Sequence, residues 1–214
     1  MRIYDELPQH LDDGTANPDW LSLRAGKFTG SDFHQYMGLA KKDELSDTAE
    51  SNLYKKVLES LGYSFESYRS SAMEDGNENE PQARADYMTE TFNDVHEVGF
   101  VDWEKLRAGC SPDGVMYNTN KQIEKIIEIK CPEVKNYLKM AKGKIPPVYI
   151  SQMQYNMLIT GAKSCDFVVW HPDMILSIQE IKADANYQKD IITVLEKLNA
   201  SYDAILEEIK EFRK

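Results

Sequence analysis

The stretch Ile126-Ile127-Glu128-Ile129-Lys130 constrains the fold of this chain more than any other, because it is an apolar run that carries one acid and one base. Successive side chains of a β-strand point to opposite faces, so Glu128 and Lys130 share a face and Ile127 and Ile129 share the other. About fifteen residues upstream, Asp113 lies in Pro112-Asp113-Gly114, whose residue types favour a turn. We therefore expect a core strand whose charged face lies near an acidic turn.

This pattern suggests a site that binds a divalent cation and hydrolyses phosphodiesters. Hydrolysis of a phosphodiester needs an activated water, a neutralised phosphate oxygen and a stabilised leaving group, and bound divalent ions supply all three. Mg²⁺ prefers carboxylate oxygens and needs few protein ligands, so Asp113 and Glu128, with the carbonyl of Ile129, form a plausible set. Lys130 would position or deprotonate the water, or stabilise the developing charge. The alternative is an exposed edge strand with an ordinary Glu/Lys pair.

The distribution of charge bears on the partner. The net charge of −11 alone argues against a nucleic-acid partner. However, residues 62–104 hold eleven acids and two bases, a net of −9, whereas residues 121–144 hold seven lysines and three glutamates, a net of +4. A basic stretch beside clustered carboxylates suits a metal-dependent enzyme with a polyanionic substrate. A solvated lysine-rich loop would give the same counts.

The pattern of apolar residues and turn residues predicts one α/β domain over residues 1–214, opening with an extended arm, 1–18. Asp19 and Ser31 are expected to cap the first two helices, Pro81 to lie in the first turn of another, and Asp184 to cap the last. The expected helices cover 19–26, 31–37, 48–61, 72–90, 133–141, 148–160 and 184–213. The expected strands cover 95–103, 108–117, 124–130, 165–170 and 174–181.

Several classes of protein are not expected. No run of eighteen apolar residues occurs, so no segment is expected to span a membrane. The charged N-terminus is not typical of a signal peptide. The three cysteines are odd in number and form no C-x-x-C pair, which indicates free cytosolic thiols rather than a cysteine-bound metal.

Five ordered sequence blocks extend this pattern, and together they resemble the lambda exonuclease/YqaJ family of PD-(D/E)xK nucleases. They run from residue 20 to about residue 157, roughly two thirds of the chain. The blocks are Trp20-Leu21-Ser22-Leu23-Arg24-Ala25-Gly26-Lys27-Phe28-Thr29-Gly30-Ser31, Gly76-Asn77-Glu78-Asn79-Glu80-Pro81-Gln82-Ala83-Arg84, Cys110-Ser111-Pro112-Asp113-Gly114, Glu128-Ile129-Lys130-Cys131-Pro132 and Gln152-Met153-Gln154-Tyr155-Asn156-Met157.

The resemblance implies a restriction-endonuclease-like core, in which helices flank a central mixed β-sheet. It implies a 5′-to-3′ exonuclease that digests one strand of duplex DNA from a 5′-phosphorylated end and leaves a 3′ overhang. It further implies two Mg²⁺ ions per active site, with Mn²⁺ as a substitute, and a ring-shaped homotrimer. The expected partner is a single-strand annealing protein, and the expected location is the cytoplasm of a bacterial host.

The resemblance also assigns roles to individual residues. Asp113 and Glu128 correspond to metal ligands, Lys130 to the catalytic lysine and Glu80 to a further acid that holds a second metal or its water. Gln154 corresponds to a glutamine that orients the site. The expected DNA contacts are Arg24, Ser31 and Ser111 for the 5′-phosphate, Met73 for a wedge at the terminal base pair, and Trp20, Lys41 and Lys135 as further contacts.

Alternatives remain open at this point. Glu80 and Arg84 also fit a structural i,i+4 pair, Gln154 fits a polar position on an amphipathic helix, and Met73 fits ordinary core packing. For the whole chain, the alternatives are a non-catalytic adaptor that binds DNA ends and an endonuclease of the same superfamily.

Overall fold

The structure is a computed structural model that describes residues 1–11, 14–65 and 71–213, without the side chains of 71–77. Two four-stranded mixed sheets form its centre, in the strand orders β1-β3-β4-β2 and β5-β6-β7-β8. The first sheet contains β1 (Arg2–Tyr4), β2 (Phe28–Thr29), β3 (Phe100–Trp103) and β4 (Ala108–Cys110). The second contains β5 (Gly114–Tyr117), β6 (Ile123–Lys130), β7 (Ser164–Val169) and β8 (Ser177–Lys182).

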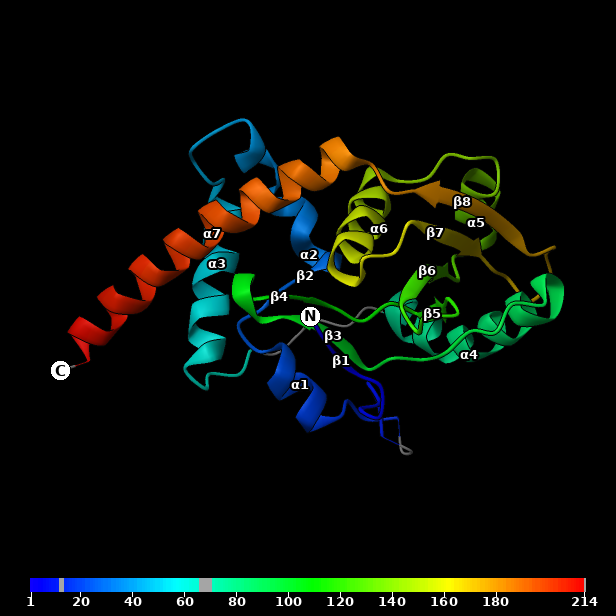
Figure 1. Ribbon diagram of the computed structural model, residues 1–214, viewed down its shortest axis with the longest axis horizontal. Coiled ribbons are helices and arrows are strands. Elements are labelled where there is room, and N and C mark those ends of the chain that lie inside the picture. The colour runs from blue at the N-terminus through cyan, green and yellow to red at the C-terminus, as the bar shows by residue number, and fades with distance from the viewer. Residues whose placement is uncertain (12–13, 66–70, 214) are drawn as a thin grey trace.

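Helices surround the two sheets (Figure 1). The α-helices are α1 (Pro18–Arg24), α2 (Gly30–Phe33), α3 (Asp47–Ser60), α4 (Ser71–Thr91), α5 (Val134–Met140), α6 (Pro147–Thr160) and α7 (Ala185–Phe212). Two 3₁₀ segments, η1 (His34–Ala40) and η2 (Glu104–Leu106), complete the described elements. None of the helices within the described ranges has the length and apolar character needed to cross a membrane.

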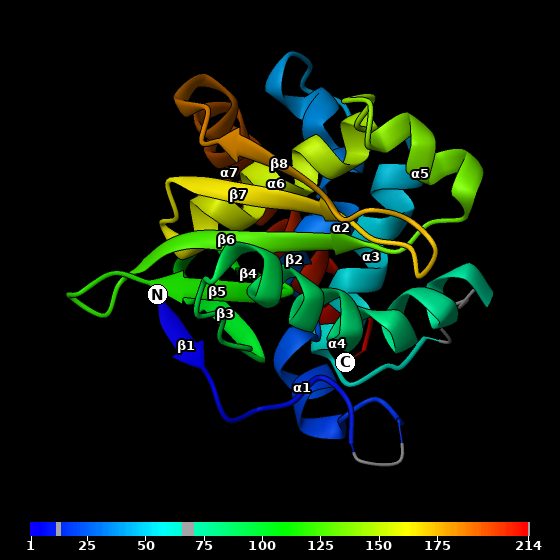
Figure 2. The same ribbon diagram turned by 90° about the vertical axis from the view of Figure 1, so that its right-hand side faces the viewer.

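Strand β6 lies in the interior of its sheet, antiparallel to β5 and parallel to β7. Its two faces pack against different groups of residues: Ile126 faces the main core, and Ile127 and Ile129 face a second cluster that includes Ala83 and Tyr87 of α4. In Figure 2, α4 lies on the near side of these strands and α6 on the far side. The alternative of an exposed edge strand is therefore wrong for β6.

The N-terminal arm is more ordered than the sequence predicted, because its residues Arg2–Tyr4 form β1 and pair with β3. Gly99 holds the arm in place: its N–H donates to the carbonyl of Tyr4 at 3.0 Å. A Cβ atom at position 99 would meet the carbonyl oxygen of Leu7 at 1.6 Å, so only glycine allows this close approach. The arm is thus packed against the body of the protein.

Several boundaries differ from the predictions. Asn17, not Asp19, caps α1 through its side chain. Thr29 occupies the cap position of α2, so Ser31 lies inside the first turn, and Pro81 lies within α4 rather than at its start. The single strand expected over 108–117 is two strands in different sheets, because the chain turns at Pro112-Asp113.

Other boundaries agree closely. The helices predicted at 48–61, 133–141 and 148–160 correspond to α3, α5 and α6, each within two residues. Asp184 caps α7 by accepting hydrogen bonds from the N–H groups of Asn186 and Tyr187. Gly161 ends α6 with a φ of +76°, a conformation that favours glycine.

Candidate active site

The charged pair on β6 lies at the centre of the candidate site. Glu128 is only 1% exposed, and Lys130 Nζ lies 2.5 Å from Glu128 Oε1. The other carboxylate oxygen, Oε2, lies 3.4 Å from Nδ2 of Asn156 on α6. An acid this deeply buried needs charged or hydrogen-bonding partners, and β6 and α6 supply them from two sides.

Asp113 reaches the same strand from the turn between β4 and β5. Its Oδ2 accepts a hydrogen bond of 2.6 Å from the N–H of Ile129. The ladder between β5 and β6 ends at the pair Gly114 and Ile127, so Ile129 has no ladder partner on that side. Because the N–H and C=O of one strand residue point in the same direction, the Ile129 carbonyl also faces the Asp113 side. The backbone geometry thus brings a carboxylate and a carbonyl oxygen together.

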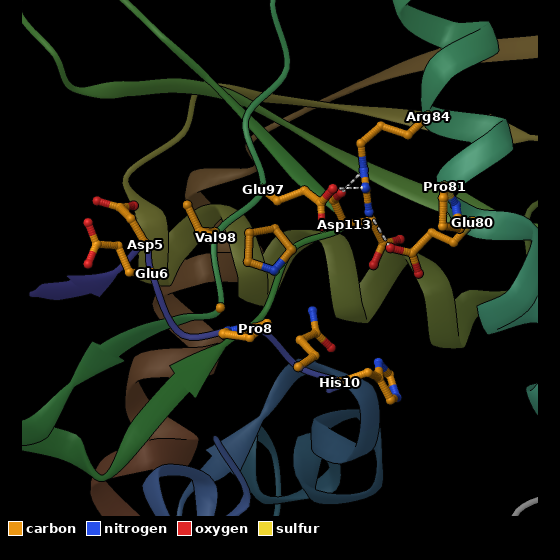
Figure 3. A pocket seen from close by; sticks show the side chains of 13 residues that line it. Asp5, Glu6, Pro8, His10, Glu80, Pro81, Arg84, Glu97, Val98 and Asp113 are labelled. Atoms are coloured by element: carbon orange, nitrogen blue, oxygen red, sulfur yellow. Dashed lines mark hydrogen bonds and ion pairs between the residues drawn. The ribbon is translucent and has the colours of Figure 1, made fainter. Parts of the chain in front are cut away.

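Glu80 approaches this cluster from α4. Its Oε1 lies 2.6 Å from Nη2 of Arg84, one helical turn later. Nε of Arg84 donates to the backbone carbonyl of Asp113 at 2.8 Å, and Nη1 lies 2.5 Å from Glu97. Figure 3 shows the guanidinium of Arg84 between these groups. The i,i+4 pair expected as an alternative exists, but it is also connected to Asp113.

The clustered carboxylates repel one another and are poorly solvated, which shifts their pKa values upward. Burial and the nearby charge of Asp113 raise the pKa of Glu80 to about 8, and burial raises that of Glu128 to about 7. Burial also raises the pKa of Asp113. Burial alone would lower the pKa of Lys130, but the charges of Glu128 and Asp113 raise it, so Lys130 is a cation.

A cavity of about 500 Å³ adjoins Glu80 and Asp113 (Figure 3). The N-terminal arm forms its opposite wall, through a segment that includes Pro8 and His10. The arm, which the sequence marked only as extended, therefore borders the candidate site.

Three residues predicted to bind a 5′-phosphate or DNA lie together, two on α1 and one directly after β4. The Arg24 guanidinium lies over the Trp20 ring, 4.3 Å from its centroid. Trp20 Nε1 lies 3.2 Å from Ser111 Oγ, and both groups donate to the carbonyl of Gly99. Burial lowers the pKa of Arg24, an effect that Asp32 counters, which places the start of α2 near this arginine.

The structure places Gln154, Lys41 and Lys135 outside this cluster. Nε2 of Gln154 donates to the carbonyl of Lys182, and its Oε1 accepts from the N–H of Asp184, so Gln154 joins α6 to the start of α7. Lys41, at the end of η1, and Lys135, on α5, are exposed surface residues. The side chain of Met73 lies outside the described residues.

Asn156 is a site residue that the sequence analysis missed. It lies two residues beyond Gln154, on the opposite side of α6, where residues 152 and 156 share a face. Its Oδ1 lies against Gly30 at the start of α2, where a Cβ atom would approach to 2.3 Å. A search for i,i+4 polar pairs on this helix would have identified residues 152 and 156.

The residues present fit a divalent metal ion by their chemistry. Glu80, Asp113 and Glu128 offer carboxylate oxygens and Ile129 a carbonyl oxygen, the ligand types that Mg²⁺ prefers. Burial is the main cause of the raised pKa values of Glu80 and Glu128, so a cation bound here would stabilise their ionised forms. Among the described residues, however, no three acidic, His or Cys side chains converge closely enough to form a ready-made metal centre.

The fold is one known from exonucleases of solved structure. An alkaline exonuclease from Laribacter hongkongensis matches it with a TM-score of 0.80 and 30% identity, over 92% of this chain and 98% of that one. The same enzyme in complex with dAMP gives the same values. A phage-related exonuclease from Haemophilus somnus 129PT shares the fold, with a TM-score of 0.61, 21% identity and coverage of 86% and 96%. These matches confirm the predicted α/β fold with mixed sheets flanked by helices.

The family follows from the sequence itself. The model of the YqaJ-like viral recombinase domain matches residues 19–163. The chain therefore belongs to the YqaJ-like viral recombinase domain family, which confirms the resemblance described above. No curated protein matches the chain.

Proposed function

We propose that the chain is a phage-type, metal-dependent exonuclease that digests one strand of duplex DNA from its 5′-phosphorylated end. The observation that carries this proposal is the ion pair of the buried Glu128 with the half-buried Lys130, beside Asp113. The names of the structural neighbours as exonucleases add support. This digestion would leave a 3′ overhang, which would serve recombination by strand annealing in the cytoplasm of a bacterial host.

In this mechanism, the carboxylates of Asp113 and Glu128 and the carbonyl of Ile129 would hold Mg²⁺, and Glu80 would hold a second ion or its water. A divalent ion at this position would supply an activated water and neutralise charge on the phosphate. Lys130, which is held by Glu128, orients the attacking water and stabilises the negative charge that develops on the phosphate. Asn156 keeps Glu128 in its orientation from the other side.

The proposed 5′ polarity rests on the group formed by Trp20, Arg24 and Ser111. A guanidinium matches the geometry of a terminal phosphate, and the stack on Trp20 fixes its plane. The Ser31 hydroxyl and the backbone N–H groups near it would add donors from the start of α2. This group uses residues separate from Asp113, Glu128 and Lys130, so recognition of the end and cleavage can be tested independently.

A duplex with a different label at each 5′ end tests the proposal directly. The wild-type chain should release nucleotides from the 5′-phosphorylated strand with Mg²⁺ or Mn²⁺ but not with EDTA. Lys130→Ala should lower the rate by at least about a hundredfold. Lys163→Ala, which removes an exposed lysine, is the matched control.

Three results would contradict the proposal. A folded Lys130→Ala variant that digests DNA at the wild-type rate would exclude the proposed role of Lys130. Cleavage of a covalently closed circle would indicate an endonuclease. Binding of the duplex in both Mg²⁺ and Ca²⁺, with cleavage in neither, would indicate a non-catalytic adaptor that binds DNA ends.

We also propose that the active form is a homotrimer that works with a single-strand annealing protein. Both proposals derive from the family. Light scattering should give about three times the chain mass of 24.6 kDa. A monomer across micromolar concentrations would exclude the trimer, and processivity through a closed ring would then be excluded as well.

A further inference from the structure

Arg84 connects three segments that are far apart in the sequence. It lies on α4 and is only 8% exposed. Its Nη2 pairs with Glu80 on its own helix, its Nε donates to the carbonyl of Asp113 in the β4–β5 turn, and its Nη1 pairs with Glu97 before β3. Each of the three guanidinium nitrogens therefore has a different partner.

The planarity of the guanidinium gives these contacts a geometric consequence. Its donors form a rigid fork, so the two atoms that it holds keep a fixed relative position. The part of α4 around Arg84 is itself fixed, because Ala83 and Tyr87 are buried against Ile127 and Ile129 of β6. Arg84 thus fixes the Glu80 side chain and the Asp113 backbone relative to β6, the strand that carries Glu128.

In each of the two acids, Glu80 and Asp113, these contacts hold only one of the two carboxylate oxygens. Arg84 holds Oε1 of Glu80, and the Ile129 N–H holds Oδ2 of Asp113. The second oxygen of each carboxylate, Oε2 of Glu80 and Oδ1 of Asp113, takes no part in these contacts. An ion that binds between the acids would therefore meet oxygens whose orientation is already fixed by the protein.

We propose that Arg84 is a positioning residue that holds Glu80 and Asp113 in the arrangement needed to bind a divalent ion, and that Glu97 only balances the charge of Arg84. This inference rests on the proposed function, because it assigns Arg84 a task in the same site. Glu97 has a side chain that is 74% exposed, so water can replace its contact with Arg84 at little cost. The contacts of Arg84 with Glu80 and Asp113 are the ones that matter.

The test measures the affinity of the DNA-free protein for Mn²⁺ by electron paramagnetic resonance. The variants are Arg84→Lys, Arg84→Gln and Glu97→Gln. A lysine keeps the charge but cannot hold two partners at fixed positions. We expect both Arg84 variants to bind Mn²⁺ at least about tenfold more weakly, as is typical when a partner of a metal ligand is removed. Glu97→Gln should bind with wild-type affinity. In DNA cleavage, the Arg84 variants should need more Mg²⁺ for half-maximal rate.

A folded Arg84→Lys or Arg84→Gln variant with wild-type Mn²⁺ affinity would overturn the proposal and leave Arg84 as a stabiliser of α4. If Arg84→Gln fails to fold, a comparison with Glu80→Gln decides the question. Arg84→Lys should weaken Mn²⁺ binding less in the Glu80→Gln background than in the wild type, and an equal loss in both would overturn the proposal. A wild-type chain that binds Mn²⁺ but cuts no DNA would refute the proposed function without touching this result.

Discussion

Asn156 shows how much a single buried amide can contribute to this site. Its Nδ2 faces Glu128, while its Oδ1 is buried against Gly30 and has no hydrogen-bond partner among the described residues. A buried polar atom without a partner costs free energy, so such an arrangement indicates a task other than stability. The task that the geometry suggests is orientation of the Glu128 carboxylate.

Asn156→Ala should therefore lower the rate of DNA cleavage by about tenfold or more, because Glu128 loses one of its two partners. The effect on thermal stability should be small, since the substitution also removes the unpaired Oδ1. Single-turnover cleavage at saturating Mg²⁺, together with thermal unfolding, measures the two effects. Cleavage at the wild-type rate would show that Lys130 alone holds Glu128.

Gln154→Ala should have the opposite effect: it should lower stability and leave the cleavage rate unchanged. Gln154 is 3% exposed and bonds to the backbone of Lys182 and Asp184, so its loss should cost about 1 kcal/mol or more of the free energy of unfolding. For a chain of this size, each kcal/mol corresponds to a fall in Tm of about 2–4 °C. The cleavage rate at a temperature where the variant is folded should stay unchanged. A reduced rate without loss of stability would restore the role assigned from the family.

These two residues also show where prediction from sequence ends. The spacing of Asp113, Glu128 and Lys130 was sufficient to place them in one cluster, because the strand period and the turn fix their directions. The role of residues on α6 depends on which side of the helix faces β6. Because residues 152, 154 and 156 are all polar, the sequence does not show which of these side chains faces the strand. Only the packing of α6 in the folded protein determines this orientation.

At the scale of elements, the N-terminal arm depends on one backbone contact. The carbonyl of Leu7 lies so close to Gly99 that any side chain there must displace the arm. The same glycine accepts the hydrogen bonds of Trp20 and Ser111 through its carbonyl. A change at this position therefore affects the cavity wall and the group proposed to bind the 5′-phosphate together.

Gly99→Ala should detach β1 from β3 and cost about 1–3 kcal/mol, in the range found for overpacked sites. Amide hydrogen exchange should be faster in residues 2–4, and cleavage of a 5′-phosphorylated duplex should slow. Gly38→Ala is the matched control, since a Cβ there meets no atom within 4 Å and the backbone is unstrained. Unchanged exchange in β1 would show that the arm tolerates the added methyl group.

The elements that could be predicted are those whose signals are local. The apolar stripe and the Asp184 cap were sufficient for α7, and its predicted range agrees with Ala185–Phe212. In contrast, β1 has only three residues and exists because β3 pairs with it, a contact with a segment about a hundred residues away. The division of 108–117 between two sheets likewise depends on tertiary packing rather than on residue propensity.

At the scale of the whole molecule, the acids of the candidate site make stability depend on pH. The pKa values of Glu128 and Glu80 are raised from 4.5 to about 7 and about 8. A carboxyl group whose pKa is raised by folding contributes stability that is complete below its unfolded value and is lost as the pH rises through its folded value. The metal-free protein should therefore lose stability as the pH rises from about 4.5 to about 8.

Divalent ions should reverse this loss, because they bind the ionised carboxylates of the folded state. The rise in Tm on addition of Mg²⁺ should be larger at pH 9 than at pH 6, and EDTA should abolish it. Thermal unfolding at both pH values measures the difference, and Glu128→Gln is the variant in which the effect should shrink. An equal rise at the two pH values would contradict the link between these acids and metal binding.

The parallel pairing of β6 and β7 has a consequence for the time at which activity arises during synthesis. Residues leave the ribosome in order, and β6 lacks its parallel neighbour until Ser164–Val169 has emerged. Asn156 and the rest of α6 also arrive after the strand that they support. A nascent chain that already carries Asp113, Glu128 and Lys130 thus has no assembled site. The candidate site can therefore assemble only after the chain has been made through α6 and β7.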